Sequence, residues 1–310
     1  MTSGAAGPHD VIARQRLPEG SRWRVREREL MLDRPLVVGI LNVTPDSFSD
    51  GGRFDDPSRA IAHAEAMLAA GADLIDVGGE STRPHNQPVD AAAELGRVIP
   101  IIRELARRFP HTTISIDTVK AMVAEAALGE GAHVVNDVSA FRLDPAMAKL
   151  CGAARCGVVV MHSRGDVATM ARYEHANYDD VVDSVISELG IALRTAADAE
   201  IAPPAIVVDP GIGFSKRSEH SLAMLGGIPR LLALGHPVLV GASRKRFIGE
   251  ITHVEHADER VAGSVGAAVA ALMLGARLFR VHDVAPTRQA LDVAWAVARA
   301  GNAATTTRTT

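Results

Sequence analysis

Eight short apolar runs recur along this chain, each followed by a polar or glycine-bearing loop and then by a segment with helical periodicity. The runs are continuous in Val, Ile and Leu instead of alternating with polar residues, as expected for parallel strands buried on both faces. Their starts are spaced by about 35 residues, the size of a βα unit. The runs are 36–41, 74–77, 113–116, 133–135, 157–161, 205–208, 237–240 and 278–281.

Eight βα units in one chain predict an α/β protein with a single-domain (β/α)8 TIM barrel and a short N-terminal extension. A doubly wound open sheet is the alternative, but the count of eight favours closure, and no G-x-G-x-x-G follows the first run. We expect the extension to cover 1–35, the barrel 36–300 and a disordered, Thr-rich tail 301–310. Within the extension, 23–30 alternates charged and apolar residues and could form a strand or hairpin that plugs or flanks the core.

Charge and composition argue against several function classes. Lys and Arg number 33 against 37 Asp and Glu, so the formal net charge of −4 gives no basic field for nucleic acid. Aromatic residues make up only 4% of the chain, too few for base-stacking platforms. No apolar run reaches the roughly 20 residues of a membrane span, and no signal peptide is evident. We therefore expect a cytoplasmic protein without nucleic-acid or membrane partners.

Polar side chains follow every run at its C-terminal end, which is where barrel active sites lie. Asp117, Asn136 and Asp209 suit a flat heterocycle that presents N–H donors beside a carbonyl. Cations follow the last two runs, where barrels commonly bind phosphate: Arg244, Lys245, Arg280 and His282. Any one of these residues alone could be a helix cap, a turn or a structural histidine. Together they predict a heterocycle on one side of the barrel mouth and an anion on the other.

Several of these segments resemble the signatures of dihydropteroate synthases. GILNVTPDSFSDGG at 39–52 and DVGGESTRP at 76–84 are similar to the first two signatures of that family. The later ones follow in the family's order as SIDT at 115–118, VND at 135–137, DPGIGFSK at 209–216, GASRK at 241–245 and RVHD at 280–283. The resemblance covers 36 to about 298.

The resemblance implies a barrel, usually homodimeric, that joins 7,8-dihydropterin-6-ylmethyl diphosphate to 4-aminobenzoate. Such a transferase (EC 2.5.1.15) releases diphosphate and forms 7,8-dihydropteroate in folate biosynthesis, with help from Mg²⁺. Sulfonamides resemble 4-aminobenzoate, so they are expected to compete for its pocket. The two long loops 42–52 and 78–84 have the composition of flaps that close over a substrate.

The resemblance also assigns residues. The metal ligand would be Asn42. The pterin would be held by Asp117, Asn136, Asp209 and Lys245, and the catalytic set would be Asp117, Asp209 and Lys245. The diphosphate would be held by Thr82, Arg280 and His282. The aminobenzoate would be framed by Phe48, Arg83, Pro84, Phe214, Ser243 and Lys245.

The chain departs from the family pattern in three places. His85 and Asn86 follow the second signature where Gly is usual, Ser215 replaces a usual Gly, and 163–164 is Ser-Arg where an apolar residue is usual. We expect these changes to alter only flap geometry and the aminobenzoate pocket.

Two other functions stay open at this point. A related pterin-binding barrel transfers a methyl group from methyltetrahydrofolate to a corrinoid protein, and it would not need the anion clamp of Arg280 and His282. A non-catalytic pterin-binding protein with an inert site is the other alternative. Diphosphate release on addition of both substrates would separate all three.

Overall fold

The computed structural model describes residues 20–43, 56–80 and 88–306, and within these ranges it contains all eight expected strands. The barrel strands are β3 (Leu36–Asn42), β4 (Leu74–Gly78), β5 (Thr113–Asp117), β6 (Val134–Asp137), β7 (Gly157–Met161), β8 (Ile206–Asp209), β9 (Leu239–Val240) and β10 (Leu278–Val281). They are parallel and pair in the order β8-β7-β6-β5-β4-β3-β10-β9. The ends of this order meet through a parallel bridge between Val208 and Val238. The sheet therefore closes, and the TIM-barrel prediction is confirmed against the open sheet.

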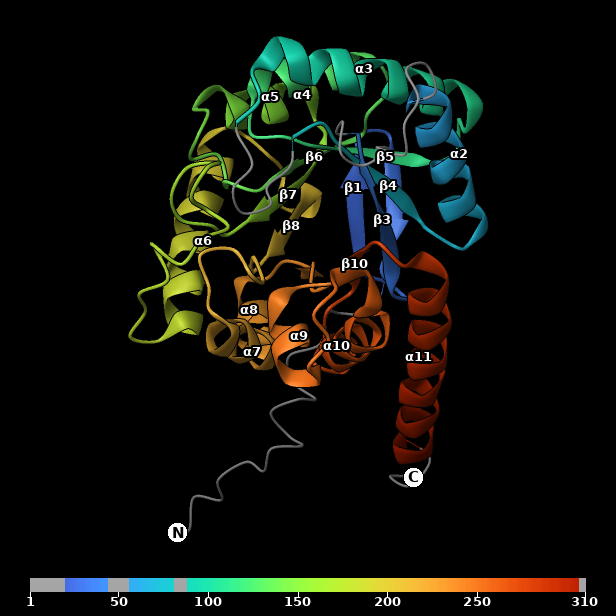
Figure 1. The fold of residues 1–310 in the computed structure, drawn as a ribbon, viewed down its shortest axis with the longest axis vertical. Coiled ribbons are helices and arrows are strands. Elements are labelled where there is room, and N and C mark those ends of the chain that lie inside the picture. The colour runs from blue at the N-terminus through green and yellow to red at the C-terminus, as the bar shows by residue number, and fades with distance from the viewer. Residues whose placement is uncertain (1–19, 44–55, 81–87, 307–310) are drawn as a thin grey trace.

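Helices connect the strands and form the outer layer of the barrel (Figure 1). They are α2 (Asp56–Ala69), α3 (Ala91–Arg108), α4 (Ala121–Gly129), α5 (Ala146–Ala154), α6 (Val181–Asp198), α7 (Ser218–Gly226), α8 (Ile228–Leu231), α9 (Arg246–Thr252), α10 (Val261–Met273) and α11 (Val284–Thr306), with 3₁₀ turns η2 (Pro203–Ala205), η3 (Leu232–Leu234) and η4 (Ala257–Glu259). Helix α3 begins where Asp90 accepts a hydrogen bond from Ala93 N at 2.7 Å, as an N-cap residue does. Helix α11 extends to Thr306, into the segment expected to be a tail.

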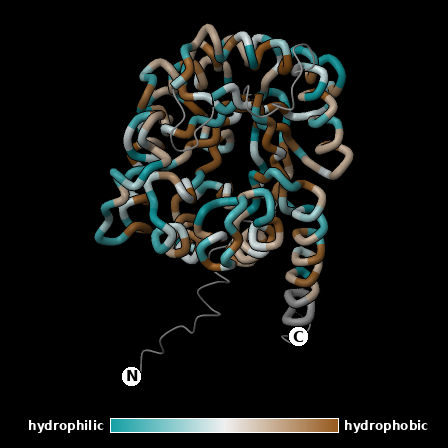
Figure 2. The backbone as a smooth tube through the Cα atoms, in the orientation of Figure 1, coloured by the Kyte–Doolittle hydropathy of each residue, from teal (hydrophilic) through white to brown (hydrophobic). Residues whose placement is uncertain are grey.

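The core has two layers, one between strands and helices and one inside the barrel. The backbone is most hydrophobic along the central strands and more polar along the outer helices (Figure 2). In α6 the buried residues are Val181, Val182, Val185, Leu189, Ala192 and Ala196, a stripe with helical period. Val, Ile, Leu and Ala supply most of this core, which agrees with the low aromatic content. No helix among the described residues is both long and apolar enough to span a membrane.

The N-terminal extension contributes an antiparallel hairpin, β1 (Arg22–Val25) and β2 (Arg28–Met31), as expected for 23–30. Trp23 and Val25 are buried in the inner layer with the first residues of several barrel strands. Trp23 Nε1 donates to Ala205 O at 2.9 Å. The hairpin therefore plugs the end of the barrel where the strands begin and leaves the other end open.

Candidate active site

A cavity of about 560 Å³ lies at the C-terminal ends of the barrel strands. It brings together the described candidate residues Asn42, Asp117, Asn136, Asp209, Phe214, Ser243, Lys245, Arg280 and His282. These residues come from strands spread along the whole sequence, and the parallel topology turns all their C-terminal ends to one side. Four candidates lie outside the described residues, so their positions are not tested: Phe48, Thr82, Arg83 and Pro84.

Arg280 on β10 connects Asp117, which lines this cavity, with Asp76, which is buried behind it. Its Nε lies 2.6 Å from Asp76 Oδ2, and its Nη2 lies 2.7 Å from Asp117 Oδ2. Asn136 Nδ2 donates to the same Asp76 oxygen at 3.1 Å. Burial raises the pKa of Asp117 to about 7, although the charge of Arg280 opposes this rise. On this side of the cavity the Arg280 guanidinium therefore fixes the positions of the hydrogen-bonding groups of Asp117 and, through Asp76, of Asn136.

Asp209 at the end of β8 is another carboxylate of the cavity, with 4% of its surface exposed. Its Oδ1 accepts a hydrogen bond from Gly211 N at 2.7 Å. Burial raises its pKa to about 6, against the Gly211 hydrogen bond and the charge of Lys245. Gly211 has φ +67°, and a Cβ there would lie 1.9 Å from His162 O. Only glycine allows the loop after β8 to approach β7 this closely.

Another wall of the cavity is formed by Lys245, Phe214 and Ser243. Lys245 Nζ lies 4.1 Å from the centre of the Phe214 ring, within cation–π distance. Burial lowers the pKa of Lys245 to about 8, and the neighbouring charge of Arg280 adds to the effect. Ser243 Oγ lies 3.0 Å from His282 Nδ1. This wall combines an aromatic face, a cation and a hydroxyl, a set that could hold an aromatic carboxylate.

The four cations expected after the last two strands all line the cavity, but two of them already have carboxylate partners. Arg244 is engaged by Asp283, with Nε–Oδ2 at 2.9 Å and Nη2–Oδ1 at 2.6 Å. Arg280 is engaged by the two carboxylates described above. Burial, aided by the charge of Arg280, lowers the pKa of His282 to about 3, so this imidazole is neutral at pH 7. Asp76 and Asp117 reach Arg280 from strands that are distant in the sequence, a pairing that the order of the strand ends does not predict.

Sequence reasoning missed two buried residues of this site. Asp76 is 1% exposed and sits inside β4, where a charged residue in the apolar string LIDV was the available signal. Lys216 is 2% exposed and lines the cavity. It is the last residue of the segment DPGIGFSK at 209–216, but the resemblance assigns it no role. Both residues lie next to the residues that the sequence did assign.

Comparison with known proteins decides the family. The family model described as pterin binding enzyme matches residues 38–282. This chain belongs to the pterin-binding enzyme family. Among its relatives, the dihydropteroate synthase of Mycobacterium leprae is 45% identical over 270 residues, which cover 86% of this chain and 94% of that protein. The resemblance to dihydropteroate synthases is thereby confirmed.

Solved structures of related enzymes give the same result. A Xanthomonas albilineans dihydropteroate synthase with 4-aminobenzoic acid superposes with a TM-score of 0.84 at 45% identity, covering 90% of this pterin-binding enzyme and 98% of that chain. A Yersinia pestis dihydropteroate synthase in complex with a sulfonamide drug gives a TM-score of 0.83 at 39% identity, with coverage of 90% and 99%.

Proposed function

We propose that this pterin-binding enzyme condenses 7,8-dihydropterin-6-ylmethyl diphosphate with 4-aminobenzoate to give 7,8-dihydropteroate and diphosphate, the dihydropteroate synthase reaction of folate biosynthesis. One observation carries the proposal: Asp117, Asn136 and Asp209 converge on a single cavity with Lys245 and Arg280. The relatives named above support the same reaction.

The pterin ring presents N–H donors beside a carbonyl oxygen, and the cavity supplies matching groups. In the proposal Asp209 and Asp117 accept from ring N–H groups, while Asn136 and Lys245 donate to ring acceptors. Charged hydrogen bonds of this kind contribute about 1.5–3 kcal/mol each. Asp117, Asp209 and Lys245 form the catalytic set because they would touch the reacting pterin.

The diphosphate is placed beside Arg280 and His282, with Thr82 as a third partner by resemblance. A neutral His282 can accept or donate at Nδ1 with Ser243, so its Nε2 is available to donate to a phosphate oxygen. The His282 tautomer with a proton on Nε2 favours the binding of an anion at that nitrogen. This arrangement binds diphosphate without requiring a charged imidazole.

The residues of the cavity fit a Mg²⁺ ion held mainly by substrate. Mg²⁺ prefers oxygen ligands and is usually bound by few protein groups plus substrate phosphates and water. Asn42 lines the cavity and offers an amide oxygen, while the described residues contain no cluster of three His, Cys, Asp or Glu suited to a metal. Asn42 would therefore be the protein ligand, and the bound ion would supply charge neutralisation at the diphosphate.

The chemistry needs no covalent intermediate on the protein. The bond between the pterin methylene carbon and the diphosphate oxygen breaks, and its electron pair leaves with the diphosphate. Asp209 and Asp117 face the positive charge that spreads into the ring, and fixed carboxylates stabilise it. The arylamine nitrogen then attacks the methylene carbon and loses one proton to solvent or to the released diphosphate. Phe214, Ser243 and Lys245 would hold the aminobenzoate for this attack.

Measured formation of 7,8-dihydropteroate from both substrates tests the proposal. The expected result is equimolar diphosphate release that depends on 4-aminobenzoate. Methyl transfer from methyltetrahydrofolate without diphosphate release would show that the chain is the corrinoid-dependent methyltransferase. Pterin binding without turnover would show that it is a non-catalytic pterin-binding protein.

The proposal includes a homodimer in the cytoplasm, as the resemblance and the sequence predict. Light scattering of the purified protein tests the dimer, and fractionation of cells tests the location.

A further inference from the structure

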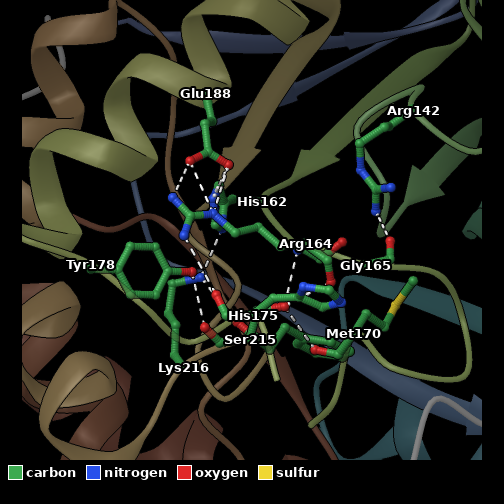
Figure 3. A network of polar contacts seen from close by, with 12 residues as sticks. Arg142, His162, Arg164, Gly165, Met170, His175, Tyr178, Glu188, Ser215 and Lys216 are labelled. Atoms are coloured by element: carbon green, nitrogen blue, oxygen red, sulfur yellow. Dashed lines mark hydrogen bonds and ion pairs between the residues drawn. The ribbon is translucent and has the colours of Figure 1, made fainter. Parts of the chain in front are cut away.

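A chain of polar contacts runs from the wall of the active-site cavity through Lys216 and His162 to Glu188 (Figure 3). Lys216 Nζ lies 2.8 Å from His162 Nδ1, and His162 Nε2 lies 3.0 Å from Glu188 Oε2. Lys216 lines the active-site cavity, whereas His162 and Glu188 line a second cavity of about 190 Å³. The contacts therefore connect the pterin site with a separate cavity behind β7.

Two of the departures from the family pattern meet at this chain. Arg164 N donates to Ser215 Oγ at 3.0 Å, and Ser215 Oγ donates to Arg164 O at 2.8 Å. The Arg164 guanidinium pairs with Glu188, with Nε–Oε1 at 3.1 Å, and stacks 4.1 Å from the Tyr178 ring centre. These residues fix Glu188 next to His162. The structure thus places two of the departures next to each other, at a contact that the sequence did not predict.

The contacts define which groups donate and which accept. Lys216 Nζ also donates to Phe214 O at 3.1 Å. Burial lowers the pKa of His162 to about 4, so at pH 7 its Nδ1 is free to accept from Lys216 while Nε2–H donates to Glu188. Burial alone would raise the pKa of Glu188, but the hydrogen bonds from His162 and Arg164 lower it to about 2. An ionised Glu188 thus selects the His162 tautomer that orients the Lys216 ammonium.

Lys216 lies close to the pterin carboxylate Asp209. Gly211 N donates to Asp209 Oδ1 at 2.7 Å, and a Cβ on Gly211 would lie 3.5 Å from Lys216 Nζ. The ammonium and the carboxylate therefore both lie against the same glycine. The positive charge of Lys216 opposes the effect of burial on Asp209.

We propose that Lys216 is a positioning residue for Asp209: its ammonium, oriented through His162 by Glu188, keeps that carboxylate ionised for the pterin ring. The inference rests on the proposed function, in which Asp209 binds the pterin. The charged and titratable groups that face Lys216 are Asp209 at the end of β8, His162 and Arg164 after β7, Glu188 on α6 and Lys245 before α9.

The test is the pH dependence of pterin binding by the full chain, measured by calorimetry between pH 5 and 9 with 6-hydroxymethylpterin. Wild-type affinity should fall on the acid side as Asp209 is protonated. Lys216→Met should move this acid limb upward by about half to one pH unit, which is about three- to tenfold weaker binding at pH 5. Lys149→Met, at an exposed position on α5, is the matched control and should leave the curve unchanged. In an Asp209→Asn background, Lys216→Met should cause no further shift.

A second variant covers the case in which Lys216→Met does not fold. Glu188→Gln keeps an acceptor for His162 and removes only the charge that favours the Lys216 ammonium. Burial already lowers the pKa of Lys216 to about 7, so Glu188→Gln should lower it further and leave less of the ammonium at pH 6. The acid limb of pterin binding should therefore move upward, in the same direction as in Lys216→Met but by less.

The outcomes are distinct. A uniform loss of affinity at every pH for Lys216→Met would assign it a purely structural role and overturn the inference, as would an unchanged acid limb for Glu188→Gln. If instead the wild type makes no dihydropteroate and shows no Asp209-dependent binding of the pterin, the proposed function itself fails.

Discussion

Asp76 and Arg280 form an ion pair of 2.6 Å across the barrel interior, and Asp76 Oδ1 is buried without a hydrogen-bond partner among the described residues. One carboxylate oxygen thus holds the guanidinium, while the other is left to a bound water or ligand donor. The pair fixes Arg280 so that its Nη2 reaches Asp117. The pterin side of the site therefore depends on a residue that need not touch the pterin.

Asp76→Asn should destabilise the fold and weaken pterin binding. Removing one partner of a buried ion pair costs about 3–5 kcal/mol, and the remaining contact with Asp117 places the expected loss near the lower end. The free energy of unfolding from urea denaturation measures it. Asp179→Asn, at an exposed position, is the control and should change stability by less than about 0.5 kcal/mol. Equal stability of the two variants would show that Asp76 does not hold Arg280.

Pterin binding should release protons near pH 6. Burial raises the pKa of Asp117 to about 7 and that of Asp209 to about 6, so both carboxyls are partly protonated there, and ring N–H donors favour the ionised forms. Affinity should rise from pH 5 to pH 8. Calorimetry in two buffers with different ionisation enthalpies measures the released protons, and a buffer-independent enthalpy at pH 6 would contradict the assignment.

The same shifts affect stability with the opposite sign. Because both folded-state pKa values lie above those of the unfolded chain, these carboxyls contribute stability that is fully present below about pH 4. That contribution is lost as the pH rises through about 6 and 7. Pterin binds more tightly when these carboxyls are ionised. Bound pterin should therefore raise the free energy of unfolding by more at pH 8 than at pH 5.

The barrel and the convergence of its site could be predicted because continuous apolar runs mark buried parallel strands, and their ends must share one face. The expected run 237–240 is longer than β9, which contains only Leu239–Val240, although Val238 also pairs with Val208 in a parallel bridge. Pro237 has no N–H to donate to a neighbouring strand. Pro237 instead accepts from Val208 N at 3.0 Å and helps close the barrel.

The ion-pair partners could not be predicted. Asp76 and Arg280 are separated by 204 positions, and nothing in the strand-end pattern says which carboxylate a guanidinium will reach. The same holds for Ser215 and Arg164, which looked like unrelated departures and are hydrogen-bonded to each other. Such pairs follow from three-dimensional packing and not from local sequence.

His282→Ala and Arg280→Ala should differ in their effects. His282→Ala should weaken the pterin diphosphate substrate by about tenfold while leaving 6-hydroxymethylpterin binding nearly unchanged, because it removes one hydrogen bond to a charged group. Arg280→Ala should weaken both ligands, since Arg280 also holds Asp76 and Asp117. Dissociation constants of both ligands for both variants test this. Equal losses of affinity for the two ligands in His282→Ala would show that the role of His282 is structural.

Trp23→Ala should reduce stability without changing the chemistry. Trp23 is 1% exposed and plugs the barrel end opposite the site, so truncation should cost about 3–5 kcal/mol. Trp295→Ala on α11, where the side chain is only partly buried, should cost less. Thermal denaturation and kcat/KM at a temperature where both variants are folded make the comparison. A large fall in kcat/KM for folded Trp23→Ala would mean that the hairpin also shapes the active site.

Sulfonamide binding should require a pterin and diphosphate. In the part of the chain that the structure describes, the proposed aminobenzoate wall consists of Phe214, Ser243 and Lys245, with Lys245 Nζ 4.1 Å from the Phe214 ring centre. The other expected members, Phe48, Arg83 and Pro84, belong to the two loops proposed as flaps. A small ligand gains little binding free energy from three residues and needs the remaining wall to be in place. Calorimetry with sulfathiazole should therefore show at least about tenfold tighter binding when 6-hydroxymethylpterin and diphosphate are present, and Phe214→Ala should abolish most of that binding. Equally tight binding to the bare enzyme would show that the pocket is preformed and that aminobenzoate need not bind last.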